Sequence, residues 1–304
     1  MARAIELIEK DIVTLQAAIR AIAAELQNAY DSYLTTLGQA LRKQLILATY
    51  HLCTQGYPEN FLRLSLNQRQ KLQQAIRNSG QEAAELLLSY LQSQAESEDE
   101  VEQNKEVHQD EQVEPEEEVD QQDEAESEDE VVTYILSDSS ALPLINSVLK
   151  SFAPDLSNPV ELAKWQQNLE NFIQQVLKNV SRDANLLLQK ASILPSKLPE
   201  PILEAAAAVS EASAEVIPGP ANLLNVVVEI TNEEDPEESR LTQIMAINLR
   251  LGEIEFADTT LSSARRQIRH VLVELNKLGR DYQKKQRERS IAEAESAWRA
   301  SWFE

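Results

Sequence analysis

The chain has 304 residues, enough for two domains of ordinary size, and carries 28 basic against 51 acidic residues, a formal net charge of −23. Cys53 is its only cysteine, which excludes an intrachain disulfide and favours a reducing compartment. The first residues lack an apolar signal-peptide core, and no run reaches the roughly 18 apolar residues that span a bilayer, so we expect a soluble, cytoplasmic protein.

The distribution of glycine and proline predicts an all-α fold. The sequence has six glycines, and nine of its eleven prolines lie between Pro143 and Pro236. The proline-free ends are rich in strong helix formers, which favours long uninterrupted helices. We therefore predict long heptad-bearing helices and a helical bundle, arranged as two helical modules joined by a disordered acidic linker.

The first expected helix carries a heptad seam, in which apolar residues recur at alternating steps of three and four. The members of this seam are Ile5, Ile8, Ile12, Leu15, Ile19, Ile22, Leu26, Ala29 and Tyr33. Alanines beside the seam widen the apolar face, which suits a bundle of three or more helices and favours a homo-oligomer. Gly56, Tyr57 and Pro58 end this helix.

A second helical stretch follows, for which Ser65 is the expected N-cap. The Asn-Ser-Gly at 78–80 is expected to close it, and residues 81–94 form a further amphipathic helix. Together these elements make an N-terminal helical or coiled-coil module over residues 1–94.

Residues 95–131 are dominated by carboxylates. The stretch 96–130 contains 19 acidic residues and one lysine, so most of the net charge is local. From Val101 the segment repeats every six residues, a period that matches neither an α-helix nor a coiled coil. Because it has few large apolar side chains, it cannot offset the entropy of ordering, and we predict a disordered acidic hexad-repeat linker.

The C-terminal module, residues 132–304, is expected to be helical and to end in a long basic helix. Residues 131–136 are the best strand candidate. A helix begins at Asn158 and Pro159 and continues to about Val180, with apolar residues on one face. The apolar residues of this face are Leu162, Trp165, Leu169, Phe172, Val176 and Val180.

Several shorter segments follow before the last helix. Residues 202–216 form an alanine-rich helix, and residues 223–230 form a buried helix, with a strand as the alternative. Residues 232–238 are an acidic helix start, and an apolar stripe over 241–254 predicts that helix to continue.

The last third ends in one long helix or in two helices in tandem. Asp258 is positioned to cap a restart, and apolar residues from Leu261 to Tyr282 keep heptad spacing. A helix that continued to Trp298 would be about 57 Å long, more than a compact domain of this size needs. We therefore expect part of it to meet another molecule.

Two stretches of this region carry a resemblance. LRLGEIEFAD (249–258) and LGRDYQKKQRERSIAEAESAWRASWFE (278–304) resemble a family of helical, coiled-coil-like proteins from cyanobacteria that has no assigned activity. The likeness covers mainly the last quarter of the chain. It implies a cytosolic bacterial protein, and no functional residues are carried over.

The sequence shows no constellation typical of catalysis. His51, His108 and His270 complete no Cys/His cluster for zinc, and we expect packed or solvated residues at these positions. A glycine-rich phosphate loop and a nucleophile elbow are absent from the sequence. We therefore predict a protein that is not an enzyme, with no catalytic, cofactor-binding or metal-binding residues.

A basic run from Ser262 to Arg289 contains nine basic residues against three acidic ones. It suggests, as the alternative function, a peripheral factor that contacts a membrane surface or nucleic acid through residues 265–289. Tyr282 is its only aromatic residue and no broad apolar face lies beside it, so a solvated helix face attracted to the acidic linker is the plainer interpretation. The candidates are Arg265, Arg266, Arg269, Lys284, Lys285, Arg287 and Arg289.

The end of the sequence suggests a partner-binding element. Trp298 and Trp302 are four residues apart and share a helix face, with Phe303 alongside and Ile291 one turn or more before them. Tryptophan is a favoured interface anchor, although these rings also suit docking on the protein's own body. The favoured hypothesis is a scaffold or adaptor that self-associates or pairs through its heptad helices and recruits a protein partner.

Overall fold

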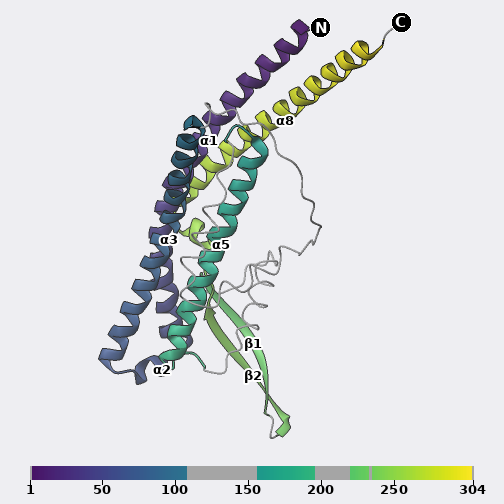
Figure 1. The fold of residues 1–304 in the computed structure, drawn as a ribbon. Coiled ribbons are helices and arrows are strands. Elements are labelled where there is room, and N and C mark those ends of the chain that lie inside the picture. Colours follow the sequence, from purple (N-terminus) through teal and green to yellow (C-terminus); the bar gives the residue numbers. More distant parts are fainter. Residues whose placement is uncertain (1, 108–155, 196–219, 233–234, 303–304) are drawn as a thin grey trace, which may run out of the picture. The chain divides into compact units, whose positions relative to one another are not determined.

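In the computed structural model, the described parts of the chain are residues 2–107, 156–195, 220–232 and 235–302 (Figure 1). Most of this backbone is helical and the described strands form one two-stranded sheet, which confirms the all-α class. In chain order the elements are α1 (Ala2–His51), the π-helical turn η1 (Leu52–Gly56), α2 (Pro58–Arg63), α3 (Leu66–Val107), α5 (Pro159–Lys190), β1 (Leu223–Asn232), β2 (Asp235–Ile247), α7 (Leu251–Ala257) and α8 (Thr259–Ser301).

Helices from both sides of the acidic segment share one compact unit. Residues 1–88 and 156–304 form this unit, and residues 89–155 form a second one. This differs from the expected division into modules 1–94 and 132–304. The helical backbone of α3 also extends to Val107, into the segment expected to be a linker, whereas residues 108–131 lie outside the described residues.

α1 and α8 lie side by side in opposite directions (Figure 1). Glu9, near the start of α1, pairs with Arg289 in the second half of α8, whereas Tyr33 contacts Glu255, which precedes α8. The heptad residues of both helices are buried or half-buried, and the buried ones are Ile12, Ile19, Leu26, Ala29, Tyr33, Leu261, Ile268, Val271 and Leu275. The two apolar seams therefore belong to a helix pair within one chain.

α5 packs beside α1 and α8 and runs opposite to α8. Its first residue, Pro159, lies against Gly279, and Glu170 one third of the way along bonds Arg265 near the start of α8. The buried ring of Trp165 meets Tyr30 edge to face, with 5.7 Å between the ring centroids. The apolar face predicted for this helix is its buried face, and the helix continues ten residues past Val180 to Lys190.

The first part of α3 approaches α1 closely. A Cβ atom added at Gly38 would lie 2.9 Å from Cβ of Ala84, and one added at Gly80 would lie 3.4 Å from Cδ2 of Leu45. The predicted helix end at 78–80 is wrong, because α3 passes through these residues without a break. Gly80 has no positive φ; its missing side chain lets two helices come together.

The expected helix starts are confirmed. Asn158 accepts a hydrogen bond from the Val160 N–H at 3.0 Å, and Asp258 accepts from Thr260 and Leu261 at 2.9 and 3.2 Å. Ser65 and Gln68 exchange the bonds of a capping box at the start of α3. Each cap satisfies N–H groups that lack an intrahelical acceptor, which stabilises the helix by about 1 kcal/mol.

β1 and β2 form a β-hairpin, so the helices expected over 223–230, 232–238 and the first half of 241–254 are wrong; of these positions, 233 and 234 lie outside the described residues. β1 and β2 are antiparallel, with Leu223 opposite Ile247. The β-branched run at 226–228 favours an extended chain, and Asn222 starts the hairpin with a φ of 61°, which asparagine tolerates. The strand alternative for 223–230 is the observed one.

Two side chains from outside the hairpin bind the backbone at its base. Asn185 of α5 donates to the carbonyl of Ile247 and accepts from the same residue's N–H, both at 2.9 Å. The Tyr57 hydroxyl accepts from the Met245 N–H at 3.0 Å and donates to its carbonyl at 3.2 Å. Because both residues serve the outer edge of β2, polar side chains replace a third strand there.

Two expected elements lie outside the described residues. These are the strand candidate at 131–136 and the alanine-rich helix at 202–216.

Candidate functional site

The side of α8 that faces away from α1 forms a continuous exposed surface, which we call the outer face of α8. Its central line steps by four and three residues through Arg266, His270, Val273, Lys277, Arg280, Lys284, Arg287 and Ile291, with Arg269 beside it. Every one of these side chains is exposed. At 3.6 residues per turn this spacing gives a nearly straight line along the helix.

The outer face carries an excess of positive charge. Six of its members are Arg or Lys, and none of the six forms an ion pair with a described residue: Arg266, Arg269, Lys277, Arg280, Lys284 and Arg287. His270 lies 3.4 Å from Glu274, one turn away. Glu274 and Asp281 are the exposed acidic residues beside this line, so the six cations are in excess on the outer face. Within the part of the chain that the structure describes, no carboxylate is paired with these six cations.

The sequence-predicted anionic-surface candidates are divided between two sides of the helix. Arg266, Arg269, Lys284 and Arg287 lie on the outer face, as expected for such a role. Arg265, Lys285 and Arg289 point toward other elements of the fold and hold carboxylates there. The charges of these three residues are paired within the chain, and a role for them at an anionic surface stays a prediction.

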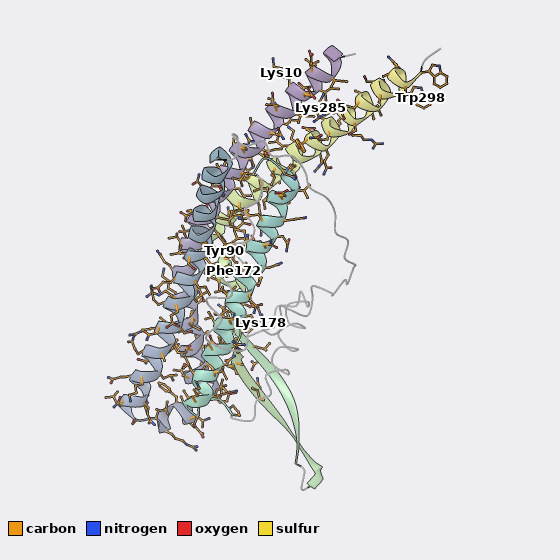
Figure 2. The ribbon with its side chains drawn as sticks, in the orientation of Figure 1. Lys10, Tyr90, Phe172, Lys178, Lys285 and Trp298 are labelled. Atoms are coloured by element: carbon orange, nitrogen blue, oxygen red, sulfur yellow. The ribbon has the colours of Figure 1, made fainter. Side chains whose placement is uncertain are left out.

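Lys285 and Arg289 join α8 to the first turns of α1. Lys285 lies beside α1 (Figure 2). Its ammonium is 3.0 Å from Glu288 and 3.1 Å from Asp11. Hydrogen bonds to these carboxylates raise the pKa of Lys285, and Glu293 and Glu9 act in the same direction on the pKa of Arg289. These exposed pairs fix the register of two antiparallel helices and add little stability.

Arg265 is the centre of a largely buried polar cluster. It donates two hydrogen bonds to Glu170 of α5, the longer at 2.8 Å, and one to Glu255 of α7 at 2.7 Å. The Tyr30 hydroxyl donates to Glu170 at 2.5 Å and the Tyr33 hydroxyl to Glu255 at 2.6 Å. Four helices, α1, α5, α7 and α8, therefore meet at one guanidinium.

The protonation states in this cluster follow from burial and hydrogen bonding. Burial opposes the ionised form of Glu170, but hydrogen bonds from Arg265 and Tyr30 outweigh it and hold the pKa of this carboxyl below its usual value. Burial and the neighbouring carboxylates raise the pKa of Tyr30 and of Tyr33, so both phenols stay protonated as donors. Because each ionised group and each phenol of the cluster has a hydrogen-bond partner within it, the cluster fits a structural role.

The C-terminal tryptophans are exposed. Trp298 lies near the end of α8 (Figure 2). Trp298 and Trp302 are 66% and 64% accessible, and their ring centroids lie 5.5 Å apart. Docking on the protein's own body is therefore not observed among the described residues. Ile291 is 51% exposed and lies on the same outer face, whereas Phe303 lies outside the described residues. The apolar end of the outer face thus continues the cationic line.

The seam of α1 is not a free surface. Ile12, Ile19 and Leu26 are buried within the single chain, and Ile5, Ile8, Leu15 and Ile22 are half-buried beside them. Self-association through this seam stays a prediction, and it would have to act on side chains that the chain already covers.

Lys277 and Arg280 were missed as site residues by the sequence analysis. The signal was present, because alternating steps of four and three connect them to Arg266 and Arg287. The sequence analysis also missed the partners of Arg265. No local pattern could have shown that Arg265 pairs with Glu170, since these two residues lie 95 positions apart in the chain.

The remaining candidates do not converge on a reactive site. His51 and Cys53 lie near the end of α1, and burial raises the pKa of the Cys53 thiol to about 11. His270 is exposed on the outer face, and His108 lies outside the described residues. Within the described ranges, no group of three or more His, Cys, Asp or Glu side chains is arranged to hold a metal ion.

None of the helices in the described part of the chain has an apolar stretch long enough to cross a bilayer. Comparison of the chain with protein-family models, with curated proteins and with solved structures gave no match. The resemblance to a cyanobacterial family therefore stays a prediction.

Proposed function

We propose that this protein is a non-enzymatic adaptor that docks onto a partner through the outer face of α8. The observation that carries the proposal is the outer face itself: it has six exposed basic side chains, none paired with a carboxylate of the described residues, and an exposed tryptophan pair at its end. Exposure of a large aromatic ring to water is unfavourable, and about two thirds of the surface of Trp298 and of Trp302 is exposed. Such exposed rings are typical of a binding surface and not of a helix face that contacts only solvent.

The rest of the unit supports this role by fixing α8 in place. The apolar side of the helix packs on α1, Arg265 ties it to α5 and α7, and Lys285 ties it to the start of α1. A docking face on a rigid helix loses little conformational freedom when a partner binds. In this proposal the heptad surfaces of α1 and α8 stabilise the fold of the adaptor, and the outer face of α8 binds the partner.

Site-specific photo-crosslinking in intact cells tests this function without assuming the partner's class. A benzophenone amino acid is placed at Val273 or Ile291 on the outer face, and at Leu62 of α2 as a control. Val273 and Leu62 are matched in exposure, at 67% and 68%. We expect the outer-face probes to form protein or lipid adducts that the Leu62 probe does not form. Equal adduct patterns from both positions would contradict docking through α8.

A further inference from the structure

The outer face of α8 has a positively charged part and an apolar part, and a single class of partner can bind both. Its middle is cationic, from Arg266 to Arg287, and its end is apolar and aromatic, with Ile291, Trp298 and Trp302. Val273, which is 67% exposed, lies in the cationic line itself. A docking partner should therefore offer negative charge over a long distance and an apolar zone next to it.

The cationic line is long and straight. Arg266 and Arg287 are separated by about 32 Å at 1.5 Å per residue, and the six cations lie on one side of a single uninterrupted helix. A flat anionic surface meets all six at once. A B-form duplex presents its phosphates along two winding strands, separated by grooves of about 12 and 6 Å, so a straight helix that crosses it meets only some of them.

The aromatic end also favours a lipid surface. Tryptophan is enriched at membrane–water interfaces, where its ring sits at the headgroup level and its N–H keeps a polar partner. Trp298 and Trp302 lie where the cationic line ends, so their rings can enter this zone while the cations stay among the headgroups. Base stacking would instead require aromatic residues interleaved with the cations, and Tyr282 lies off the outer face and is half-buried.

We propose that the outer face of α8 binds the surface of a bilayer that contains anionic phospholipids, with Trp298 and Trp302 as interfacial anchors. This assignment rests on the proposed docking function and names its partner. The protein lies on the bilayer and does not cross it, in agreement with the lack of a spanning helix in the described part of the chain.

Flotation with vesicles tests the assignment on the full chain, so that the bilayer must compete with the chain's own acidic segment. We use phosphatidylcholine vesicles with and without 30% phosphatidylglycerol. Each Lys or Arg near such a surface contributes about fivefold in the partition constant, the equivalent of about 1 kcal/mol. We expect binding to the anionic vesicles alone and a steep loss of binding as the salt concentration rises.

The central variant replaces four cations of the outer face by glutamine: Lys277, Arg280, Lys284 and Arg287. Its control makes the same change in net charge at exposed basic positions on other helices: Arg63, Lys71, Arg77 and Lys164. We expect the outer-face variant to lose at least ~100-fold in partitioning and the control variant to lose less than ~5-fold. Similar losses in the two variants would overturn the proposal, since the effect would then be one of net charge.

Tryptophan fluorescence reports the anchors directly. Trp165, the third tryptophan, is buried in the helical core, so a change on vesicle addition comes from Trp298 and Trp302. We expect a blue shift with anionic vesicles, absent from the double variant Trp298→Ala/Trp302→Ala, which should also bind several-fold more weakly. If the wild-type protein floats with the vesicles but its fluorescence does not shift, the assignment of Trp298 and Trp302 as anchors is wrong.

A labelled 20-base-pair DNA duplex and the photo-crosslinks separate the other outcomes. Binding to the duplex without flotation would overturn the lipid assignment in favour of nucleic acid. Protein adducts at Val273 or Ile291 without flotation would overturn it in favour of a protein partner, and the docking function would stand. Absence of both adducts and flotation would overturn both proposals.

Discussion

Tyr33 and Arg265 share one carboxylate oxygen and one stacked contact. The Tyr33 hydroxyl and Nε of Arg265 both donate to Oε1 of Glu255, at 2.6 and 2.7 Å. The guanidinium carbon of Arg265 also lies 4.9 Å from the centroid of the Tyr33 ring. Hydrogen bonding and a cation–π contact thus hold the same two side chains, and through them α1 and α8.

Arg265→Met should destabilise the fold by about 3 kcal/mol, at the lower end of the cost of breaking a buried ion pair, because the cluster keeps some exposure. The substitution leaves Glu170 and Glu255 largely buried without their cation. Urea unfolding followed by circular dichroism measures the effect. The neighbouring Arg266→Met removes an exposed cation and should stay within about 0.5 kcal/mol of the wild type. Equal losses in the two variants would argue against the cluster as a structural centre.

Asn185→Ala should destabilise the base of the hairpin by about 2 kcal/mol or more. It leaves both the N–H and the carbonyl of Ile247 without their hydrogen-bond partners in a buried setting. Hydrogen exchange should show faster exchange at the Ile247 amide. The exposed Asn171→Ala on the same helix is the control, and its free energy of unfolding should change by less than about 0.5 kcal/mol. Unchanged exchange at Ile247 would contradict the clamp.

Gly38→Ala and Gly252→Ala should act in opposite directions. The new Cβ at Gly38 meets Ala84 at 2.9 Å, so α1 and α3 must separate, and we expect a net destabilisation of about 1–2 kcal/mol. At Gly252 nothing lies within 4 Å, and alanine should stabilise the protein by about 0.5–1 kcal/mol. The urea concentration at the midpoint of unfolding should fall for Gly38→Ala and rise for Gly252→Ala. The double variant Gly38→Ala/Ala84→Gly should regain part of the loss.

The low pKa of Glu170 makes this residue a source of acid sensitivity. Since its folded pKa lies below the unfolded value of about 4.3, its contribution is full above that pH and is lost as the pH falls through the folded pKa. The difference in unfolding free energy between wild type and Glu170→Gln should therefore shrink between pH 6 and pH 3. The same comparison for the exposed Glu82→Gln should show a difference within about 0.5 kcal/mol throughout. A constant difference for Glu170→Gln would contradict this role.

Cys53 should react slowly with thiol reagents in the folded protein. Its raised pKa, about 11, leaves little thiolate at pH 8, so alkylation should be on the order of 100-fold slower than for a free cysteine. Because the chain has a single cysteine, mass spectrometry reads the rate without ambiguity. Urea should remove the protection, and rapid labelling without urea would mean that the end of α1 opens.

The parts of the fold that the sequence predicted are those controlled by local pattern. Heptad spacing placed the buried faces of α1 and α8, and the caps at Asn158 and Asp258 fixed where two helices begin. Exposure of the outer face was also encoded in this spacing, since its positions alternate with the buried ones along α8.

The rest depended on contacts between distant residues. The stripe at Leu241, Ile244 and Ile247 fits a helix, yet these residues pair with β1 because Asn185 and Tyr57 supply a polar edge from elsewhere. Likewise, Gly80 resembles a helix stop in the sequence and becomes a contact point only when α1 is beside it. Arg265 reads as one more basic surface residue until Glu170 is placed next to it.

The pairing of Glu9 with Arg289 has a consequence for synthesis on the ribosome. α1 leaves the ribosome long before α8 exists, and at about 5–20 residues per second its apolar seam waits on the order of ten seconds or more for its partner. During that time the nascent seam is open to the same seam of a neighbouring chain on the polysome. Contacts of such high sequence separation also slow folding. During synthesis, pairing of α1 with its own α8 therefore competes with association of α1 with another nascent chain.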